Sequence, residues 1–254
     1  MKAIIIAAGR GKRMKKVTEE IPKCLLPIAG RPLMEIQLEI LRSLGIFDVN
    51  VIKGYKKEKI SFPEVKYFIN DDYLNNNILE SLFYAEEVIY GEVIIHYCDI
   101  IFEKSIVMRL MESDADISIV VDVDWQENYR DRKDHPIDEA ENVIFDKNYC
   151  VQQIGKIIDG DKYSISGEFI GMVKLSDRGA KTLRKVYWES RDKYAYRKFQ
   201  KAESFKKAYL TDIFQEMVDN DFKIKCVPIR NGWQEIDTEE DFNKAACFWE
   251  NMIK

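Results

Sequence analysis

The feature that most limits the folds open to this chain is an unbroken apolar run at residues 3–8 (AIIIAA), which ends directly at Gly9. A run without polar alternation is typical of a strand buried on both faces, as in a parallel sheet. Parallel strands need long crossover connections, usually helices. The sequence that follows supplies both kinds of element. Further apolar runs predict strands at 49–54, 65–70, 92–98 and 116–123, and helical spacing of apolar residues predicts helices at 33–44, 78–89 and 105–111.

The alternation of strands and helices predicts an α/β fold with a mostly parallel central sheet flanked by helices. After residue 124 the pattern changes to a polar stretch that leads into further elements. We expect a short hairpin at 143–145 and 151–154, a strand at 168–175, and helices at 177–191, 209–218 and 238–252. Thr238 and Asp241 have the spacing of a capping box at the start of the last helix. No repeat or linker interrupts the chain, so we predict a single domain over residues 1–254.

Composition excludes several classes of protein. The chain has 254 residues and a net charge of −5 with scattered Lys and Arg, which argues against a nucleic-acid partner. Its five cysteines are odd in number and lack Cys-x-x-Cys spacing, which favours reduced thiols in a cytoplasmic protein. No apolar run approaches the ~20 residues that span a bilayer, and the N-terminal run is too short for an export signal. We therefore expect no membrane association.

A glycine-rich turn follows the first predicted strand, with the sequence Ala7-Ala8-Gly9-Arg10-Gly11-Lys12-Arg13-Met14. Glycines after a buried strand expose backbone N–H groups to phosphate oxygens. Met14 replaces the third glycine of a dinucleotide-binding turn, and no Gly-Lys-Ser/Thr closes a P-loop. Taken alone, the turn fits an ordinary strand-to-helix connection equally well.

A second motif, residues 21–28 (IPKCLLPI), follows the glycine-rich turn at the spacing found in one family. Together the two motifs resemble the nucleotidyltransferases that make NDP-sugars and CDP-alcohols, and the Arg13-Met14 ending is more similar to the cytidylyltransferases among them. The resemblance implies a Rossmann-like nucleotidyltransferase fold, with a nucleotide-binding part at about 1–124 and an acceptor-side part at about 125–235. It assigns nucleotide binding to the turn, at Ala7, Ala8, Gly9, Arg10, Gly11, Lys12 and Arg13.

The resemblance also makes Lys23 and Arg13 the catalytic cations. The chemistry agrees, because attack of one anion on another needs fixed positive charge near the α-phosphorus. A surface lysine is the alternative for Lys23, although its proline and apolar neighbours make it the weaker one.

Two aspartates are candidates for holding Mg²⁺, the expected cofactor. Asp99 follows the strand predicted at 92–98, at the edge of the sheet where ligands bind in open α/β folds. Asp237 precedes the last helix, where the family places a second carboxylate. Two carboxylates together with substrate phosphates are a usual Mg²⁺ site. The alternatives are a turn residue for Asp99 and a helix-start carboxylate for Asp237.

An asparagine-rich segment at 70–82 resembles the corresponding part of phosphocholine cytidylyltransferases. We expect Asn76, Asn77 and Ser81 to contact the nucleotide, with CTP as the donor, because amides offer both a donor and an acceptor. The alternative is that asparagines here serve turns and a helix N-cap.

The acceptor-side part contains the segments 121–125 (VDVDW), 134–136 (DHP), 139–143 (EAENV) and 167–171 (GEFIG), together with Arg130 and Arg132. With these segments it resembles cytidylyltransferases of phosphonate and phosphoramidate biosynthesis. Sugar-nucleotide enzymes of the family carry a phosphate-binding Lys where this chain has Phe169, so another cation must take that role. His135 is left without an assignment. The residues that we expect to bind the acceptor are Asp122, Asp124, Trp125, Arg130, Arg132, Glu168 and Lys174.

The sequence thus predicts a Mg²⁺-dependent cytidylyltransferase whose partners are CTP and a small phosphorylated or phosphonate acceptor. Homodimer formation is left open. A sugar-1-phosphate nucleotidylyltransferase is the runner-up, disfavoured by Phe169. A non-catalytic regulatory subunit would have no need to keep Lys23, Arg13 and Asp99. A glycosyltransferase would use an Asp-x-Asp motif such as Asp122 and Asp124, but not the glycine-rich turn.

Overall fold

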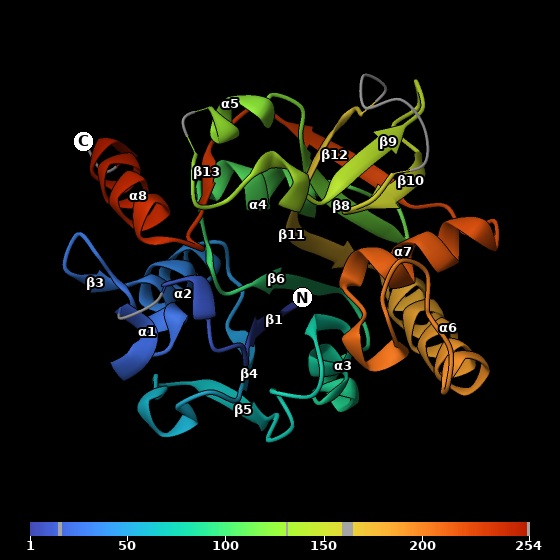
Figure 1. The fold of residues 1–254 in the computed structure, drawn as a ribbon, viewed down its shortest axis with the longest axis horizontal. Helices are drawn as coiled ribbons and strands as arrows, with labels where there is room; N and C mark the ends of the chain where they lie inside the picture. Colours follow the sequence, from blue (N-terminus) through green and yellow to red (C-terminus); the bar gives the residue numbers. More distant parts are fainter. Residues whose placement is uncertain (15–16, 131, 159–164, 253–254) are drawn as a thin grey trace.

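In the computed structural model, which describes residues 1–14, 17–130, 132–158 and 165–252, the chain forms one large mixed sheet with helices on both faces (Figure 1). The strand order is β10-β9-β11-β6-β1-β4-β5, and β8 pairs with β11 and β12. The strands are β1 (Lys2–Ala7), β4 (Asp48–Lys53), β5 (Val65–Ile69), β6 (Val93–Tyr97), β8 (Ile117–Asp122), β9 (Asn142–Phe145), β10 (Val151–Gly155), β11 (Gly167–Leu175) and β12 (Lys225–Ile229).

The parallel part of the sheet is the one that the apolar runs predict. Strand β1 pairs in parallel with β4 and β6, and β4 pairs in parallel with β5. All six residues of β1 are buried. Ile4 and Ile6 pack into the apolar cluster on one face of the sheet, and Ile5 packs into the cluster on the other. The predicted fold class, a mostly parallel central sheet flanked by helices, is confirmed.

Strand β11 runs antiparallel to its neighbours β6, β8 and β9. Its first residues therefore lie at the sheet edge where β6 and β8 end, and its last residues lie at the opposite edge. Glu168 is paired with Asp122 at the end of β8, whereas Lys174 is paired with Ile94 near the start of β6. The direction of this strand decides which of its side chains can reach the carboxyl edge.

The described helices connect the strands and cover both faces (Figure 1). The segment predicted as one helix at 78–89 is α3 (Ile78–Phe83) followed by a separate 3₁₀ turn, Glu86–Val88. None of the described helices combines the length and apolar character needed to cross a membrane. The helices are α1 (Val17–Glu20), α2 (Leu33–Ser43), α3 (Ile78–Phe83), α4 (Lys104–Met111), α5 (Gln126–Tyr129), α6 (Asp177–Tyr194), α7 (Leu210–Asp219) and α8 (Glu239–Met252).

Several short strands have no clear sequence signal. Strand β12 begins with Lys225 and contains Pro228, and it pairs in parallel with β8. Strand β7 (Ile100–Phe102) pairs with β13 (Trp233–Glu235), and β2 (Pro27–Ile28) pairs with β3 (Arg31–Pro32). The β7–β13 pair brings the chain before α8 next to Asp99.

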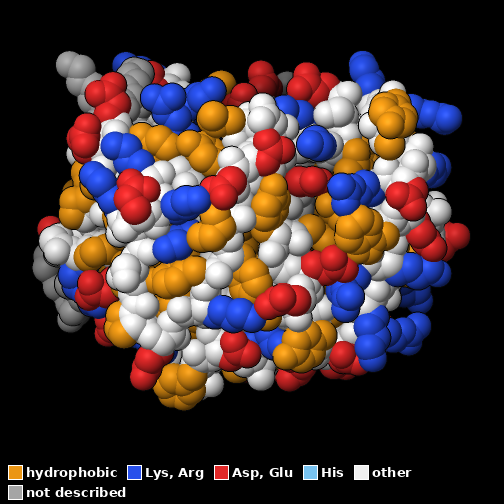
Figure 2. Space-filling view, turned by 90° about the horizontal axis from the view of Figure 1, so that it is seen from below, with side chains coloured by type: hydrophobic (Ala, Val, Ile, Leu, Met, Phe, Trp, Pro, Cys, Tyr) orange, Lys and Arg blue, Asp and Glu red, His pale blue; other side chains and the backbone are white. Residues whose placement is uncertain are grey.

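On the face drawn in Figure 2, acidic and basic side chains are interspersed, with no stripe of one sign across it.

Candidate active site

The two N-terminal motifs pack against each other. Gly11 has a φ of +64°, which favours glycine, and a Cβ added there would lie 2.9 Å from Cε of Lys23. Thr18 Oγ1 donates a hydrogen bond of 3.0 Å to the Gly11 carbonyl oxygen. Glycine at position 11 therefore lets the turn close over the lysine.

The predicted nucleotide-binding turn runs from buried to exposed. Ala7 and Ala8 are buried at the end of β1, and Gly11 is half-buried. The other four residues are exposed, with backbone or side chains open to solvent: Gly9, Arg10, Lys12 and Arg13.

Lys23 lies between the two aspartates that the sequence singles out. Its Nζ is 3.0 Å from Asp99 Oδ2 and 2.6 Å from Asp237 Oδ1, and its side chain is 7 % exposed. Burial alone would lower the pKa of Lys23, but the carboxylates of Asp99 and Asp237 outweigh it and raise the pKa above its usual value. A permanently charged ammonium and two carboxylates thus meet at one point.

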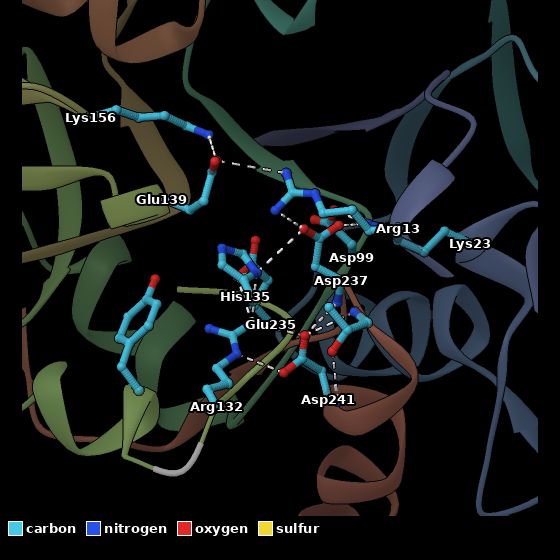
Figure 3. A network of polar contacts seen from close by, with 12 residues as sticks. Arg13, Lys23, Asp99, Arg132, His135, Glu139, Lys156, Glu235, Asp237 and Asp241 are labelled. Carbon is cyan, nitrogen blue, oxygen red and sulfur yellow. Dashed lines mark hydrogen bonds and ion pairs between the residues drawn. The ribbon is translucent and has the colours of Figure 1, made fainter. Parts of the chain in front are cut away.

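Arg13 extends this cluster toward the acceptor-side part of the chain. Its Nη1 lies 2.5 Å from Asp237 Oδ2, and its Nη2 lies 4.0 Å from Glu139 Oε2. Lys156 Nζ is 2.8 Å from the same Glu139 oxygen. Figure 3 shows the resulting row of alternating charges from Lys156 to Lys23. Burial would raise the pKa of Asp237, but Lys23 and Arg13 lower it to about 2.

A second layer of contacts fixes the segment that carries Asp237. Asp241 Oδ2 accepts hydrogen bonds from the backbone N–H groups of Asp237 (3.1 Å) and Thr238 (2.9 Å), and Thr238 Oγ1 accepts one from the N–H of Asp241. This is the predicted capping box. The guanidinium of Arg132 in turn holds Asp241 and Glu235.

His135 lies beside Arg132, Glu235 and Asp237. Its Nδ1 lies 3.4 Å from Asp237 Oδ2 and 3.5 Å from Glu235 Oε2. One potential ligand atom from each of the three residues lies within 4.8 Å of the other two, which is close enough to hold a metal ion. Arg132 Nη2 lies 3.1 Å from the same ring nitrogen. Burial and then Arg132 lower the pKa of His135 to about 4, so its imidazole is neutral near neutral pH. Asp99 and Asp237 offer carboxylate oxygens, the ligand type that Mg²⁺ prefers, at the same point.

Two cavities meet at the carboxyl ends of β1 and β6. The first is framed by the glycine-rich turn and lined by Gly9, Gly11, Lys23, Tyr73, Asn76, Asn77, Ser81 and Cys98. The second lies on the acceptor side and is lined by Arg13, Tyr129, His135, Glu139, Glu141, Lys156, Glu168, Phe169, Tyr209, Glu235 and Asp237. Ile78, Tyr97 and Asp99 line both. A molecule in one cavity would therefore contact a molecule in the other beside Asp99.

The acceptor-side cavity combines carboxyl groups with aromatic rings. Burial raises the pKa of Glu141 to about 8, that of Glu235 to about 7, and that of Glu168 well above its usual value. Tyr129 donates a hydrogen bond to Glu168 Oε1, and Glu168 Oε2 is buried without a hydrogen-bond partner. A buried carboxyl oxygen without a partner is costly, so it indicates a place for a ligand donor.

Of the predicted acceptor-binding residues, Glu168 lines this cavity and the others do not. The prediction for Lys174 is wrong, because its side chain is buried at the opposite edge of the sheet. Its ammonium donates hydrogen bonds to the carbonyl oxygens of Met111 (2.9 Å) and Ser113 (2.6 Å). Arg132 is buried behind the cavity in its ion pairs with Asp241 and Glu235. Arg130 is exposed at the end of α5.

The predicted acceptor residues at the end of β8 also have other roles. Asp122 is fully buried and accepts hydrogen bonds from the Trp233 indole (2.8 Å) and the Asn231 backbone (3.2 Å). Asp124 pairs with Arg230 at 2.5 Å. Trp125 is buried in a small apolar cluster with Tyr129. These residues shape the wall that carries Tyr129 and do not face the acceptor-side cavity.

The predicted nucleotide-binding amides line the first cavity but are already engaged within the protein. Asn70 and Asn76 exchange side-chain hydrogen bonds of 3.0 and 3.1 Å, and Asn70 also donates to Ser81 Oγ at 2.7 Å. Asn77 is the N-cap of α3. The helix-cap alternative for Asn77 therefore holds, and any contact of Asn76 or Ser81 with a nucleotide stays a prediction.

Several residues that line the acceptor-side cavity were not predicted individually from the sequence. They are Tyr97, Tyr129, Glu139, Glu141, Lys156, Tyr209 and Glu235. The motif around Glu139 and Glu141 contributed to the resemblance, but nothing in the sequence separated these two carboxylates from their neighbours. Glu235 sits two positions before Asp237, and only the β7–β13 pairing reveals that it faces the same space.

Comparison with known proteins agrees with this geometry. Residues 3–162 match the model of the MobA-like NTP transferase domain. The chain belongs to this family. It is therefore a nucleotidyltransferase by family, and the matched region contains the glycine-rich turn, Lys23 and Asp99.

Individual relatives are named for transfer from CTP. The chain is 27 % identical over 252 residues to the CTP:phosphoglutamine cytidylyltransferase of Campylobacter jejuni, covering 95 % of this chain and 97 % of the relative. It is 37 % identical over 108 residues to the choline-phosphate cytidylyltransferase of Streptococcus pneumoniae, covering 41 % of this chain and 47 % of the relative. The solved structure of the CTP:phosphocholine cytidylyltransferase from Streptococcus pneumoniae superposes with a TM-score of 0.72 at 21 % identity, over 100 % of this chain and 99 % of that one. This last likeness establishes the fold.

Proposed function

We propose that the protein transfers the cytidine monophosphate group of CTP to a small acceptor that carries a phosphoryl or phosphonyl group and a positively charged amine. Pyrophosphate is the second product. The observation that carries the proposal is the junction of the two cavities, where Lys23, Asp99 and Asp237 lie between the glycine-rich turn and a carboxylate-lined space. The names of the relatives, which specify CTP with glutamine phosphate or choline phosphate, support the same choice.

The proposed reaction is a displacement at the α-phosphorus of CTP. An anionic oxygen of the acceptor forms a bond to this phosphorus, and the bond from phosphorus to the oxygen that bridges to the β-phosphate breaks. The ammonium of Lys23 would neutralise charge that develops at the α-phosphoryl oxygens. Arg13, at the exposed end of the turn, would bind an anionic group of a substrate.

Asp99 and Asp237 would hold Mg²⁺. The donor set fits, because Asp99 Oδ2 and Asp237 Oδ1 both contact one cation already, the ammonium of Lys23. Two carboxylates completed by substrate phosphates are a common Mg²⁺ site. When bound, Mg²⁺ supplies positive charge that neutralises the triphosphate.

The amine of the acceptor is assigned to the carboxylates of the acceptor-side cavity. Glu168 Oε2 has no hydrogen-bond partner, and Glu141 and Glu235 line the same cavity. An ammonium group would satisfy the unpartnered oxygen and restore the charge of these carboxylates, and Tyr97, Tyr129 and Tyr209 add aromatic faces that attract cations. A sugar phosphate, which offers neutral hydroxyls, would not restore the charge of these carboxyl groups.

A matrix of substrates tests the proposal. Pyrophosphate release is measured with CTP and UTP, each against phosphocholine, 2-aminoethylphosphonate, glutamine phosphate and glucose 1-phosphate. We expect CTP with an amine-bearing acceptor to be preferred. Preferred turnover of UTP with glucose 1-phosphate would refute the proposal in favour of a sugar-1-phosphate nucleotidylyltransferase.

The Glu168→Gln variant tests the assignment of the amine. It should raise KM for an acceptor with a primary ammonium group by about tenfold, since a charge-assisted hydrogen bond becomes a neutral one. The matched control is Glu58→Gln, which removes an exposed carboxylate. An unchanged acceptor KM in Glu168→Gln would remove Glu168 from the site.

A cytoplasmic location and a homodimer stay predictions.

A further inference from the structure

A single carboxylate oxygen in the acceptor-side cavity lies between two cations. Glu139 Oε2 is 2.8 Å from Lys156 Nζ and 4.0 Å from Arg13 Nη2. Lys156 follows β10 directly, its side chain is 23 % exposed, and its ammonium lies 4.7 Å from the centroid of the Tyr209 ring. Glu139 precedes β9, and Arg13 belongs to the glycine-rich turn. Three separate segments thus converge on one anion-binding position.

This position lies beside the proposed reaction centre. The guanidinium that approaches Glu139 through Nη2 also contacts Asp237 Oδ2 through Nη1, at 2.5 Å. Asp237 in turn contacts Lys23. Figure 3 shows Lys156, Glu139, Arg13 and Asp237 following one another along the cavity. An anion held by Lys156 and Arg13 would therefore lie beside the Arg13 side chain, which contacts Asp237, the partner of Lys23.

The acceptor-side cavity offers no other strong cation among the described residues that line it. Arg13 and Lys156 are its Arg and Lys side chains, and His135 is held neutral near neutral pH. Arg130, Arg132 and Lys174 do not line it, and position 169 is Phe. A phosphorylated acceptor needs fixed positive charge, so the choice narrows to two side chains.

We propose that Lys156 and Arg13 bind the phosphoryl group of the acceptor, and that the carboxylate of Glu139 occupies this position until the acceptor replaces it. The inference rests on the proposed function, whose acceptor it supplies with a phosphoryl site. The hydrogen bond from Lys156 lowers the pKa of Glu139, with Arg13 adding to the effect, so Glu139 carries the negative charge that a phosphoryl group would bring.

The two sides of this ion pair give opposite outcomes on substitution. Lys156→Gln should raise the acceptor KM about tenfold or more, while the CTP KM changes less than about twofold, because one charge-assisted contact to the acceptor is lost. Glu139→Gln should lower the acceptor KM several-fold, because the acceptor no longer competes with a carboxylate. A side chain needed only for folding would not produce this improvement. Lys185→Gln, which removes an exposed lysine on α6, is the matched control and should leave both values unchanged.

Calorimetric titration with phosphocholine, 2-aminoethylphosphonate and glutamine phosphate gives a readout that does not need turnover. We expect the wild type to bind at least one of them, Lys156→Gln to bind it about tenfold more weakly, and Glu139→Gln to bind it more tightly. If the wild type binds and converts an acceptor but Lys156→Gln keeps its affinity, the inference alone is overturned. If the wild type binds an acceptor in this way but transfers nothing from CTP, the proposed function fails and the anion site stands. If the wild type binds none of the three compounds, both are overturned.

Discussion

The ammonium nitrogen of Lys23 lies 2.6 Å from Asp237 Oδ1, although 214 positions separate the two residues in the sequence. The same nitrogen lies 3.0 Å from Asp99 Oδ2. A lysine buried to this degree requires partners, since an unpaired buried charge is strongly destabilising. The end of β6 and the chain before α8 supply them, so the cluster forms only when the N-terminal and C-terminal parts of the fold have come together.

Replacing Lys23 by Ala should lower kcat by about 10²-fold or more while KM for CTP rises only a few-fold. The reason is that its strongest contact is expected in the transition state, where charge develops at the α-phosphorus. Steady-state kinetics over CTP concentration, together with a thermal melt that checks folding, measure this. An unchanged kcat with weaker CTP binding would reduce Lys23 to a ground-state contact.

Replacing Asp99 or Asp237 by Asn should each cost at least about 10²-fold in kcat. In the wild type, Mg²⁺ with CTP should raise the Tm, because a ligand that binds only the folded state stabilises it. Asp99→Asn should lose most of this rise. Full activity in Asp99→Asn would contradict the metal assignment. Asp237→Asn is the less clean variant, because it also removes a partner of Lys23 and Arg13.

The fold could be predicted because its signals are local. A buried strand followed by glycines specifies a turn at the edge of a parallel sheet, and Asp99 is fixed there by the strand before it. Asp237 is singled out by the family resemblance, which places a second carboxylate before the last helix. These features depend on a few neighbouring residues, and the sheet brings their strand ends together.

The acceptor side could not be predicted to the same extent, because it depends on strand direction and long-range pairing. Lys174 and Glu168 lie near opposite ends of one strand, and the antiparallel direction of β11 places Glu168, and not Lys174, at the carboxyl edge of β6 and β8. Asp122 gives no local sign that Trp233 and Asn231 will bury it. Lys156 becomes a candidate only when Glu139 and Arg13 are seen beside it.

Glu141 should make stability fall as the pH rises. Burial raises its pKa to about 8 from an ordinary 4.5, although Lys156 opposes part of this shift. The folded state therefore holds a proton that the unfolded chain releases, so the contribution of Glu141 to stability is fully present below about pH 4.5 and is lost as the pH rises through about 8. Urea unfolding between these limits measures it. Glu141→Gln should flatten this dependence and be more stable than the wild type at the alkaline end, and an equally steep profile in the variant would contradict the assignment.

Arg132 and Arg130, which the sequence grouped as acceptor-binding residues, should differ sharply in their effect on stability. The Arg132 side chain is 5 % exposed and binds Asp241 through two hydrogen bonds of 2.6 and 2.9 Å, and Glu235 through a third of 3.0 Å. Arg132→Ala would leave the capping-box carboxylate of α8 buried without its cation, which costs about 3–5 kcal/mol in comparable buried pairs. Arg130 is exposed, so Arg130→Ala should change the free energy of unfolding by less than about 0.5 kcal/mol and leave the acceptor KM unaltered. Urea unfolding of the two variants, with acceptor kinetics on the folded protein, makes the comparison. A tenfold rise in acceptor KM in Arg130→Ala, with undiminished stability in Arg132→Ala, would restore the original assignment and contradict the packing described for α8.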